Sequence, residues 1–329
     1  MYTWKRYAPM VLALCLLLAV SLSGCSAING VFNGNDENEE PVNSTEGYRQ
    51  TVLYFQTDDG LMVPVMKLMP WEEGIGRAAL NQLVDTEDNK ISAASMGLKN
   101  VVPQGVSFVL SISDDAVATV NILDMPKLES AQAEQAMVTG IVNTLTEFQS
   151  IDQVQLKFDG KIKSKLSHGT KVGDVMRELP LNPEPLPVSA SADDYAYKVK
   201  LYFPNQAGSL NVPVTRSIVQ EPDIAVAMQE LVRGPADAAL RDCFPEGTEV
   251  LSASVEDDVA TVNFSKEFVA LSKEPDIEAL ALTCMQLTAQ QFGASISALH
   301  VQVDGKDLKD SAVAAMAMPA YENEFRLSD

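Results

Sequence analysis

The sequence predicts an α+β protein made of two tandem copies of one domain, because six short segments recur in the same order. In the first and second copy these segments are Leu53–Phe55 and Leu201–Phe203, Leu61–Val65 and Leu210–Val214, Leu83–Val84 and Leu231–Val232, Val102–Gly105 and Phe244–Gly247, Val117–Asn121 and Val259–Asn263, and Asp159–Lys161 and Asp304–Lys306. Matching positions lie about 142 to 149 residues apart. A period this long is far beyond that of a solenoid, so each copy should fold as its own domain.

Each copy opens with two strands. We expect them over Thr51–Gln56 and Met62–Met69 in the first copy, and over Tyr197–Pro204 and Asn211–Val219 in the second. These segments are rich in aromatic and β-branched residues, and a polar turn separates the two strands of each copy. A helix follows, which in the second copy begins near Pro222 and stops at Gly234-Pro235.

A hairpin, a long helix and a last strand complete each copy. The hairpins are expected at Val106–Ser113 with Val117–Leu123 and at Val250–Val255 with Val259–Phe264, the helices at Ser130–Phe148 and Ile277–Phe292, and the strands at Gln153–Phe158 and Ala298–Val303. Alternating apolar and polar side chains give Val117–Leu123 the period of a half-buried strand. The order is therefore ββαββαβ, with helices packed on one face of a small sheet.

The N-terminus has the layout of an export signal. Lys5 and Arg6 precede an apolar run over roughly Ala8–Val20, and Leu22-Ser23-Gly24-Cys25 follows. This last motif resembles a bacterial lipobox, which implies cleavage after residue 24 and diacylation of Cys25, with palmitate as a typical chain. The alternatives are a membrane-spanning anchor and an ordinary secretory signal. The run is shorter than the ~20 residues needed to span a bilayer, so we expect a lipid anchor on the extracytoplasmic face of the cell membrane.

The rest of the chain divides by composition. We expect a lipoprotein signal peptide at 1–24, a flexible acidic tether at 25–49, the first domain at 50–162, a proline-rich linker at 163–196, the second domain at 197–308 and a tail at 309–329. The tether has little apolar surface to bury. The prolines of Leu179–Pro187 favour an extended, stiff backbone.

Charge and cysteine content exclude several classes of function. The formal net charge of −21 repels nucleic acid and anionic lipid headgroups, so the acylated cysteine must supply the membrane attachment. With Cys15 lost with the signal and Cys25 as the lipid site, Cys243 and Cys284 are left. They could form a disulfide in an exported protein, or remain two buried thiols. No CxxC spacing points to a zinc or redox site.

Catalytic, cofactor and metal sites are not indicated. The pairs Asp114-Asp115 and Asp257-Asp258 separate expected strands, where aspartate favours a turn through local hydrogen bonds. His168 falls in the linker and His300 on a strand, and neither has the sequence context of a nucleophile's base. The sequence contains neither a phosphate-binding loop nor a dinucleotide fingerprint. We therefore expect a protein that is not an enzyme and has no cofactor.

These motifs resemble a known domain family. The Leu-Tyr-Phe opening, the Val-Pro-Val strand, Leu231–Pro235, Val259–Ser265 and the Asp-Gly-Lys ending look like the GerMN domain. The resemblance covers about 50–162 and 197–308, and the first copy departs from it at Val84–Glu87. A lipidated signal followed by two such domains is similar to the GerM-like sporulation and germination lipoproteins.

The resemblance implies a structural role. GerMN domains are similar to ring-building modules of secretion systems. Their lipoproteins help to assemble the platform of the channel between mother cell and forespore, so protein partners in the sporulation envelope are expected. The family brings no catalytic residue. An alternative remains open, in which the two domains of an extracytoplasmic solute- or cell-wall-binding lipoprotein clamp a ligand around the linker.

Overall fold

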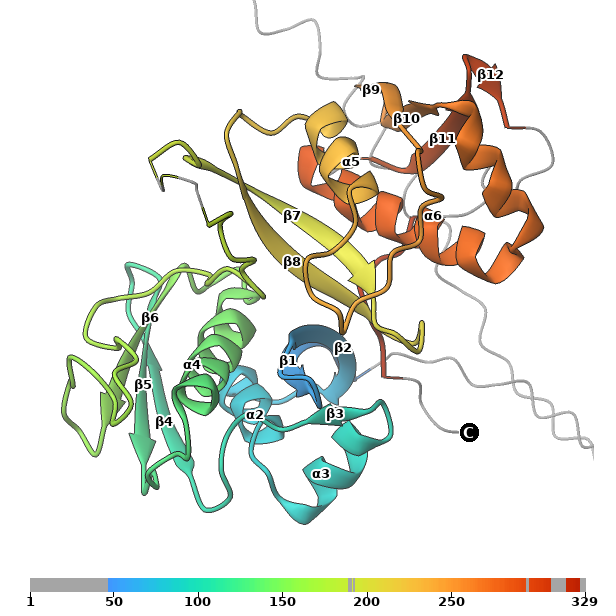
Figure 1. Ribbon diagram of the computed structural model, residues 1–329. Coiled ribbons are helices and arrows are strands. Elements are labelled where there is room, and N and C mark those ends of the chain that lie inside the picture. The colour runs from blue at the N-terminus through green and yellow to red at the C-terminus, as the bar shows by residue number, and fades with distance from the viewer. Residues whose placement is uncertain (1–46, 189–190, 192, 294–295, 309–317, 326–329) are drawn as a thin grey trace, which may run out of the picture. The chain divides into compact units, whose positions relative to one another are not determined.

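The computed structural model describes residues 47–188, 191, 193–293, 296–308 and 318–325 (Figure 1). The signal peptide, Cys25 and most of the expected tether lie outside these residues. Both repeats belong to one compact unit of the chain, Thr45–Asp329.

Two small sheets form the first repeat. Strands β1 (Tyr48–Thr57) and β2 (Met62–Pro70) make an antiparallel hairpin, to which β3 (Leu98–Lys99) adds on the β1 side. Between β2 and β3 lie the helices α2 (Ile75–Gln82) and α3 (Glu87–Ala94). The second sheet has the order β4-β5-β6, with β5 antiparallel to β4 and parallel to β6. Its elements are β4 (Ser107–Ile112), β5 (Val117–Leu123), α4 (Ala131–Thr146) and β6 (Gln153–Phe158).

The second repeat follows the same plan. Its hairpin consists of β7 (Tyr197–Pro204) and β8 (Asn211–Ile218), and its second sheet has the order β12-β11-β10-β9. The remaining elements are α5 (Ile224–Val232), β9 (Val250–Glu256), β10 (Val259–Phe264), η1 (Lys266–Lys273), α6 (Pro275–Ala289), η2 (Gln290–Phe292), β11 (Ala298–Val303) and β12 (Lys306–Asp307).

The predicted fold class is confirmed, and the structure adds two features. In the first repeat α4 contacts both the hairpin and the second sheet, so it lies between two sheets (Figure 1). This position explains why residues almost all round its C-terminal half are buried. Helix α3 was not expected. Thr86 caps its N-terminus by accepting a hydrogen bond from the Asn89 N–H, within the stretch where the two copies diverge.

The aspartate pairs lie in turns, as predicted. Asp257 and Asp258 have φ values of 48° and 63°, the left-handed backbone that a two-residue hairpin turn needs. In the first repeat the left-handed residue is Ala116, with φ 58°. Helix starts are also set by local chemistry, because Ser130 and Asp223 cap α4 and α5 by accepting hydrogen bonds from backbone N–H groups.

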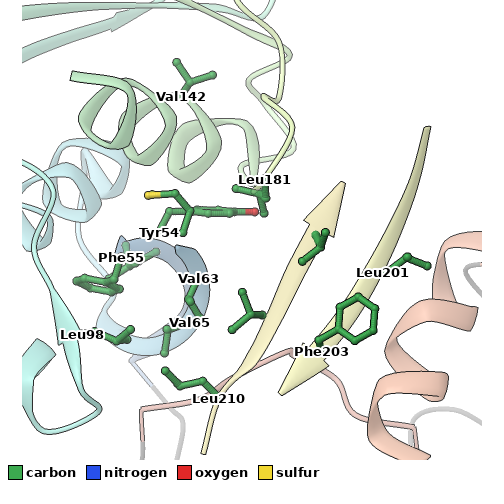
Figure 2. Packing of buried hydrophobic residues seen from close by; sticks show 14 of the residues in the cluster. Tyr54, Phe55, Val63, Val65, Leu98, Val142, Leu181, Leu201, Phe203 and Leu210 are labelled. Carbon is green, nitrogen blue, oxygen red and sulfur yellow. The ribbon is translucent and has the colours of Figure 1, made fainter. Parts of the chain in front are cut away.

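A single hydrophobic cluster runs through both repeats. Figure 2 shows the part where the β1–β2 hairpin meets β7 and β8. The cluster includes Val63 and Val65 of β2, Val212 and Val214 of β8, and the linker residue Leu181. The two Val-Pro-Val segments recognised as a repeat are thus parts of one core.

One glycine sets how closely α4 approaches β1. A Cβ on Gly140 would lie 2.5 Å from Cγ2 of Val101 and 3.3 Å from the carbonyl oxygen of Tyr54. Hydrogen bonding needs this approach, since the Tyr54 N–H donates to Oγ1 of Thr144 in the same helix, at 3.2 Å. Substitution by alanine would push the helix away from the strand.

Gly140→Ala should therefore lower the free energy of unfolding by about 1–3 kcal/mol through overpacking, although alanine favours a helix interior over glycine by ~1 kcal/mol. Urea unfolding measures the difference. Gly76→Ala in α2 is the matched control, because its Cβ would meet only the flexible ends of two leucine side chains. A Gly140→Ala variant at least as stable as the wild type would contradict this packing constraint.

Candidate functional site

The predicted site residues lie in two regions. Cys25 is outside the described residues, so its acylation stays a prediction. Cys243 and Cys284 are buried free thiols. Burial raises the pKa of Cys243 to about 11, and burial together with the neighbouring Cys243 raises the pKa of Cys284 well above its usual value. Both thiols are protonated at neutral pH and therefore weak nucleophiles. A disulfide between them is the other of the two alternatives that the sequence leaves open.

The histidines make structural contacts. Nε2 of His168 lies 2.8 Å from the Leu128 carbonyl oxygen, and Nε2 of His300 lies 3.2 Å from Oδ1 of Asp307. Across the described part of the chain, no group of three or more histidine, cysteine, aspartate or glutamate side chains is arranged to hold a metal ion.

The most organised polar site is the junction of the two repeats, which the linker crosses at Asn182. Its Oδ1 accepts a hydrogen bond from the Met62 N–H at 2.7 Å. Its Nδ2 donates to the carbonyl oxygens of Met62, at 2.8 Å, and of Pro213, at 2.7 Å. One amide side chain therefore satisfies backbone groups of β2 and β8 together.

Asn323, in the C-terminal tail, makes the reciprocal set. Its Oδ1 accepts from the Asn211 N–H at 2.8 Å, and its Nδ2 donates to the carbonyl oxygens of Asn211 and Pro64, both at 2.9 Å. Met62 matches Asn211 and Pro64 matches Pro213 in the internal repeat. Each asparagine thus binds both β2 and β8. The residues that Asn182 contacts in the two strands are the repeat counterparts of those that Asn323 contacts, with the two strands exchanged.

Backbone hydrogen bonds also hold the linker and the tail against the two strands. After Asn182, the linker pairs with β8 through the Glu184 N–H and the Thr215 carbonyl oxygen, at 3.0 Å. After Asn323, the tail pairs with β2 through the Phe325 N–H and the Met66 carbonyl oxygen, at 2.9 Å. Each repeat therefore receives an extended segment that follows the other repeat in the chain. The segment predicted as a linker packs along both domains.

A buried ion cluster holds the linker to the second repeat. Arg216 of β8 is 8% exposed and donates to both carboxylate oxygens of Glu184, at 2.5 and 3.0 Å. It also donates to Glu230 of α5 and to the Gly234 carbonyl oxygen. Burial alone would lower the Arg216 pKa, but its hydrogen bonds and the charges of Glu184 and Glu230 outweigh burial and raise the pKa.

At the first repeat the corresponding contact is weaker. Lys67 takes the place of Arg216 in the repeat, and its Nζ lies 5.3 Å from the ring centre of the tail residue Phe325. Lys67 also donates to Oε1 of Gln82 at 2.8 Å, and burial lowers its pKa. The tail is therefore held by a cation–π contact to Lys67, whereas the linker is held by a bidentate ion pair to Arg216.

Two tyrosines and three glutamates surround the junction. The hydroxyl of Tyr54 donates to Glu147 at 2.5 Å, and that of its repeat counterpart Tyr202 donates to Glu322 of the tail at 3.0 Å. Glu147 keeps part of its side chain exposed, yet burial by nearby protein atoms raises its pKa, and the charges of Glu322 and Glu178 raise it further. Protonation of Glu147 is therefore easier in the folded protein than in the unfolded chain.

Comparison with known proteins identifies the family of both repeats. The model of the Germane family, described as "Sporulation and spore germination", matches residues 52–164 and 200–309. The chain belongs to the Germane family. It is also similar to the spore germination protein GerM of Bacillus subtilis, with 26% identity over 343 aligned residues that cover 92% of each chain. These similarities support a sporulation and germination protein.

The fold agrees with this family. The tandem GerMN domains of the Bacillus subtilis sporulation protein GerM match with a TM-score of 0.67 and 23% identity, over 84% of this chain and 99% of that structure. The tandem repeat of GerMN domains is thereby confirmed. Among the described helices, none is both long enough and apolar enough to span a membrane.

Sequence reasoning missed the junction residues Asn182, Arg216 and Asn323. Two signals were available: proline within a strand limits that strand to an edge position, and Val-Pro-Val occurs in both copies. The edges therefore needed partners, but the patterns of local sequence do not say which distant segment supplies them.

Arg216→Met should destabilise the protein by about 3–5 kcal/mol, because it leaves the buried Glu184 carboxylate without its cation and leaves Glu230 paired only with the exposed Arg233. Arg233→Met is the matched control, since the Arg233 side chain is 70% exposed and contacts the same Glu230. Chemical unfolding of both variants measures the difference. Equal stability of the two variants would show that the buried cluster does not hold the linker.

Glu147→Gln should raise the thermal midpoint modestly at pH 7. Because the pKa of Glu147 is raised, its ionised carboxylate destabilises the folded protein. This destabilisation is absent below the pKa that Glu147 has in the unfolded chain, and it is complete once the pH has risen through the pKa of the folded state. A neutral amide avoids this loss, so the gain over wild type should shrink as the pH falls toward 4. Thermal melts across this range measure it, and a gain independent of pH would contradict the assignment.

Proposed function

We propose that this protein is a membrane-anchored lipoprotein without enzymatic activity, which helps to assemble the channel platform between mother cell and forespore and contributes to germination. The match of both repeats to the Germane family is the observation that carries the proposal. The anchor rests on the lipobox-like motif ending at Cys25. Two buried acyl chains are sufficient for stable membrane attachment.

Exposed edge strands support an assembly role. Strand β4 is an edge of its sheet, with Val109 and Ile112 exposed by 55% and 48%. Its counterpart β9 is an edge as well, with Leu251 exposed by 49%. An edge strand offers unpaired backbone groups to a partner's strand, and apolar side chains along it add contact area. Both repeats present such an edge at the same place.

The clamp alternative finds less support at the junction. A hollow of about 970 Å³ lies beside Met96, Leu210 and the tail residues Tyr321–Phe325. Its lining includes Asn323 and the backbone around Asn211, which are already engaged in the junction's hydrogen bonds. A ligand there would have to compete with the chain's own tail for these groups.

Crosslinking and pull-down of the tagged full chain from sporulating cells tests the proposal. The wild type should fractionate with membranes and recover channel-platform proteins. Cys25→Ala should leave the membrane fraction and lose or mislocalise these partners. Recovery of wall fragments or a small ligand alone would favour the binding-lipoprotein alternative.

A second pair of variants separates the anchor from the surface. The double variant Val109→Ser and Ile112→Ser keeps Cys25 and changes only exposed side chains of β4, so it should stay in the membrane fraction and recover fewer partners. The exposed double variant Ser107→Ala and Ser111→Ala on the same strand serves as control. If the apolar variant recovers partners as well as wild type, β4 is not the assembly surface.

A further inference from the structure

A basic segment follows the first repeat in a chain that is otherwise acidic. Residues 157–177 contain six lysine and arginine residues and two aspartates, a net charge of +4, whereas the whole chain carries −21. The second repeat has Leu308 and Asp310 at the positions that match Lys163 and Lys165, so the shared fold does not require these cations. Among the residues that the structure describes, the basic partners of the ion pairs are Lys99, Lys200, Arg216, Arg233 and His300. The cations of the basic segment therefore lack a carboxylate partner in the described chain.

Two lysines of this segment line a hollow together with a third from another loop. Lys163 and Lys165, after β6, and Lys127, in the loop after β5, lie around a volume of about 360 Å³, which we call the basic hollow. Its lining also includes Ser167 and the apolar residues Leu128 and Leu166. The volume falls in the range of small-ligand sites, roughly 300–1,000 Å³.

Hydrogen bonds fix the walls of the basic hollow. The segment Ser164–Val172 forms a hairpin, in which the Val172 N–H donates to the Ser164 carbonyl oxygen at 3.1 Å. Its turn is tied to α4, because the His168 N–H donates to Glu134 at 2.8 Å, and Nε2 of His168 lies 2.8 Å from the carbonyl oxygen of Leu128. The two loops that carry the lysines are thus joined to each other and to a helix. A site held in this way loses little conformational freedom when a ligand binds.

The charges of the basic hollow are arranged to leave the lysines available. Nζ of Lys163 lies 5.1 Å from the ring centre of Phe158, which holds this cation against the wall. Glu134 also belongs to the lining and is 2% exposed. Its two carboxylate oxygens accept hydrogen bonds from the N–H groups of His168 and Thr170, at 2.8 and 3.3 Å. An anion in the hollow is therefore expected to lie against the lysines, away from this carboxylate.

Lysine as the cation indicates phosphate rather than carboxylate as the ligand. Where this chain holds a carboxylate, it uses the planar fork of an arginine, as Arg216 does with Glu184. A lysine ammonium is a compact charge with three rotatable donors, which suits the tetrahedral oxygens of a phosphate. Three such groups around one hollow can contact several of these oxygens together.

We propose that the basic hollow binds a phosphate group, as a phosphomonoester or phosphodiester, through Lys127, Lys163 and Lys165. Leu128 and Leu166 provide apolar contact for the substituent that carries the phosphate. The same chemistry is offered by soluble phosphate compounds and phosphate polymers, and by the headgroups of anionic lipids. This site goes beyond the proposed assembly role and does not rest on it.

Calorimetric titration of the full chain in a neutral detergent tests the site, with inorganic phosphate, glycerol 3-phosphate and pyrophosphate as probes. Binding should saturate and should weaken as salt is added. Pyrophosphate should bind more tightly than tricarballylate, a tricarboxylate of similar charge. Equal binding of these two anions would show that the hollow responds to charge alone, and the assignment to phosphate would be wrong.

Two pairs of variants locate the binding. Lys163→Gln with Lys165→Gln should weaken pyrophosphate binding by about tenfold or more, because charge-assisted hydrogen bonds are lost. Lys161→Gln with Lys171→Gln is the matched control, since it removes the same charge from exposed positions of the same segment outside the lining. The control should bind close to wild type. Equal loss in both pairs would overturn the proposal, because the general charge of the segment would then be sufficient.

A variant on the opposite wall guards against a shift of the hairpin. Lys127→Gln leaves the hairpin and the Lys163 contact with Phe158 unchanged, and it should also weaken pyrophosphate binding. Wild-type affinity in this variant, or the absence of saturable binding of every phosphate probe at millimolar concentration, would refute the basic hollow as a phosphate site.

A competition experiment distinguishes the sources of the phosphate. Displacement of glycerol 3-phosphate by micelles that contain phosphatidylglycerol, and not by micelles that contain phosphatidylcholine, would support a lipid headgroup as the ligand. Retention of glycerol 3-phosphate in both would support a soluble compound or a polymer. Neither the titrations nor the competition involves a channel protein, so their outcome is independent of the proposed function.

Discussion

The backbone of two proline-containing edge strands is the constraint on which the arrangement depends. Pro64 and Pro213 lie on β2 and β8, where the buried carbonyl oxygens need donors from outside the hairpin. Asn182 donates to Pro213 and also pairs with the N–H and C=O of Met62. Asn323 donates to Pro64 and also pairs with the N–H and C=O of Asn211. An asparagine side chain suits this task because its amide both donates and accepts.

Hydrophobic packing and polar pairing cooperate at this junction. Val63, Val65, Val212 and Val214 bury the inner faces of the two hairpins in one cluster, while the prolines and asparagines complete their edges. A buried polar group without a partner costs about 1–3 kcal/mol, so sliding one hairpin along the other would break several pairs together. The two repeats are therefore held in one register, although each has its own sheets and helices.

Local patterns predicted the elements, and long-range pairing decided the rest. The duplicated Val-Ala-Thr-Val-Asn strand, the aspartate turns and the proline before α5 were sufficient to place hairpins and helix starts, because these signals act over a few residues. Helix α3 arises where the first copy diverges, so the better-matched second copy gave no guide to it. Asn323 lies 259 residues from its partner Pro64, and nothing in either local sequence encodes that meeting. Arg216 was overlooked because a single arginine in a strand does not reveal the carboxylates around it.

The position of Asn323 has a consequence for how the molecule matures. Contacts between distant positions form late, because a long loop must close first. The first repeat and the linker are complete long before Asn323 leaves the ribosome, but the edge of β2 stays open until that residue and Phe325 arrive. A chain that stops anywhere inside the second repeat retains that open edge, whose unpaired backbone groups can pair with strands of other molecules. Burial of the edge of β2 therefore requires that synthesis has passed both repeats.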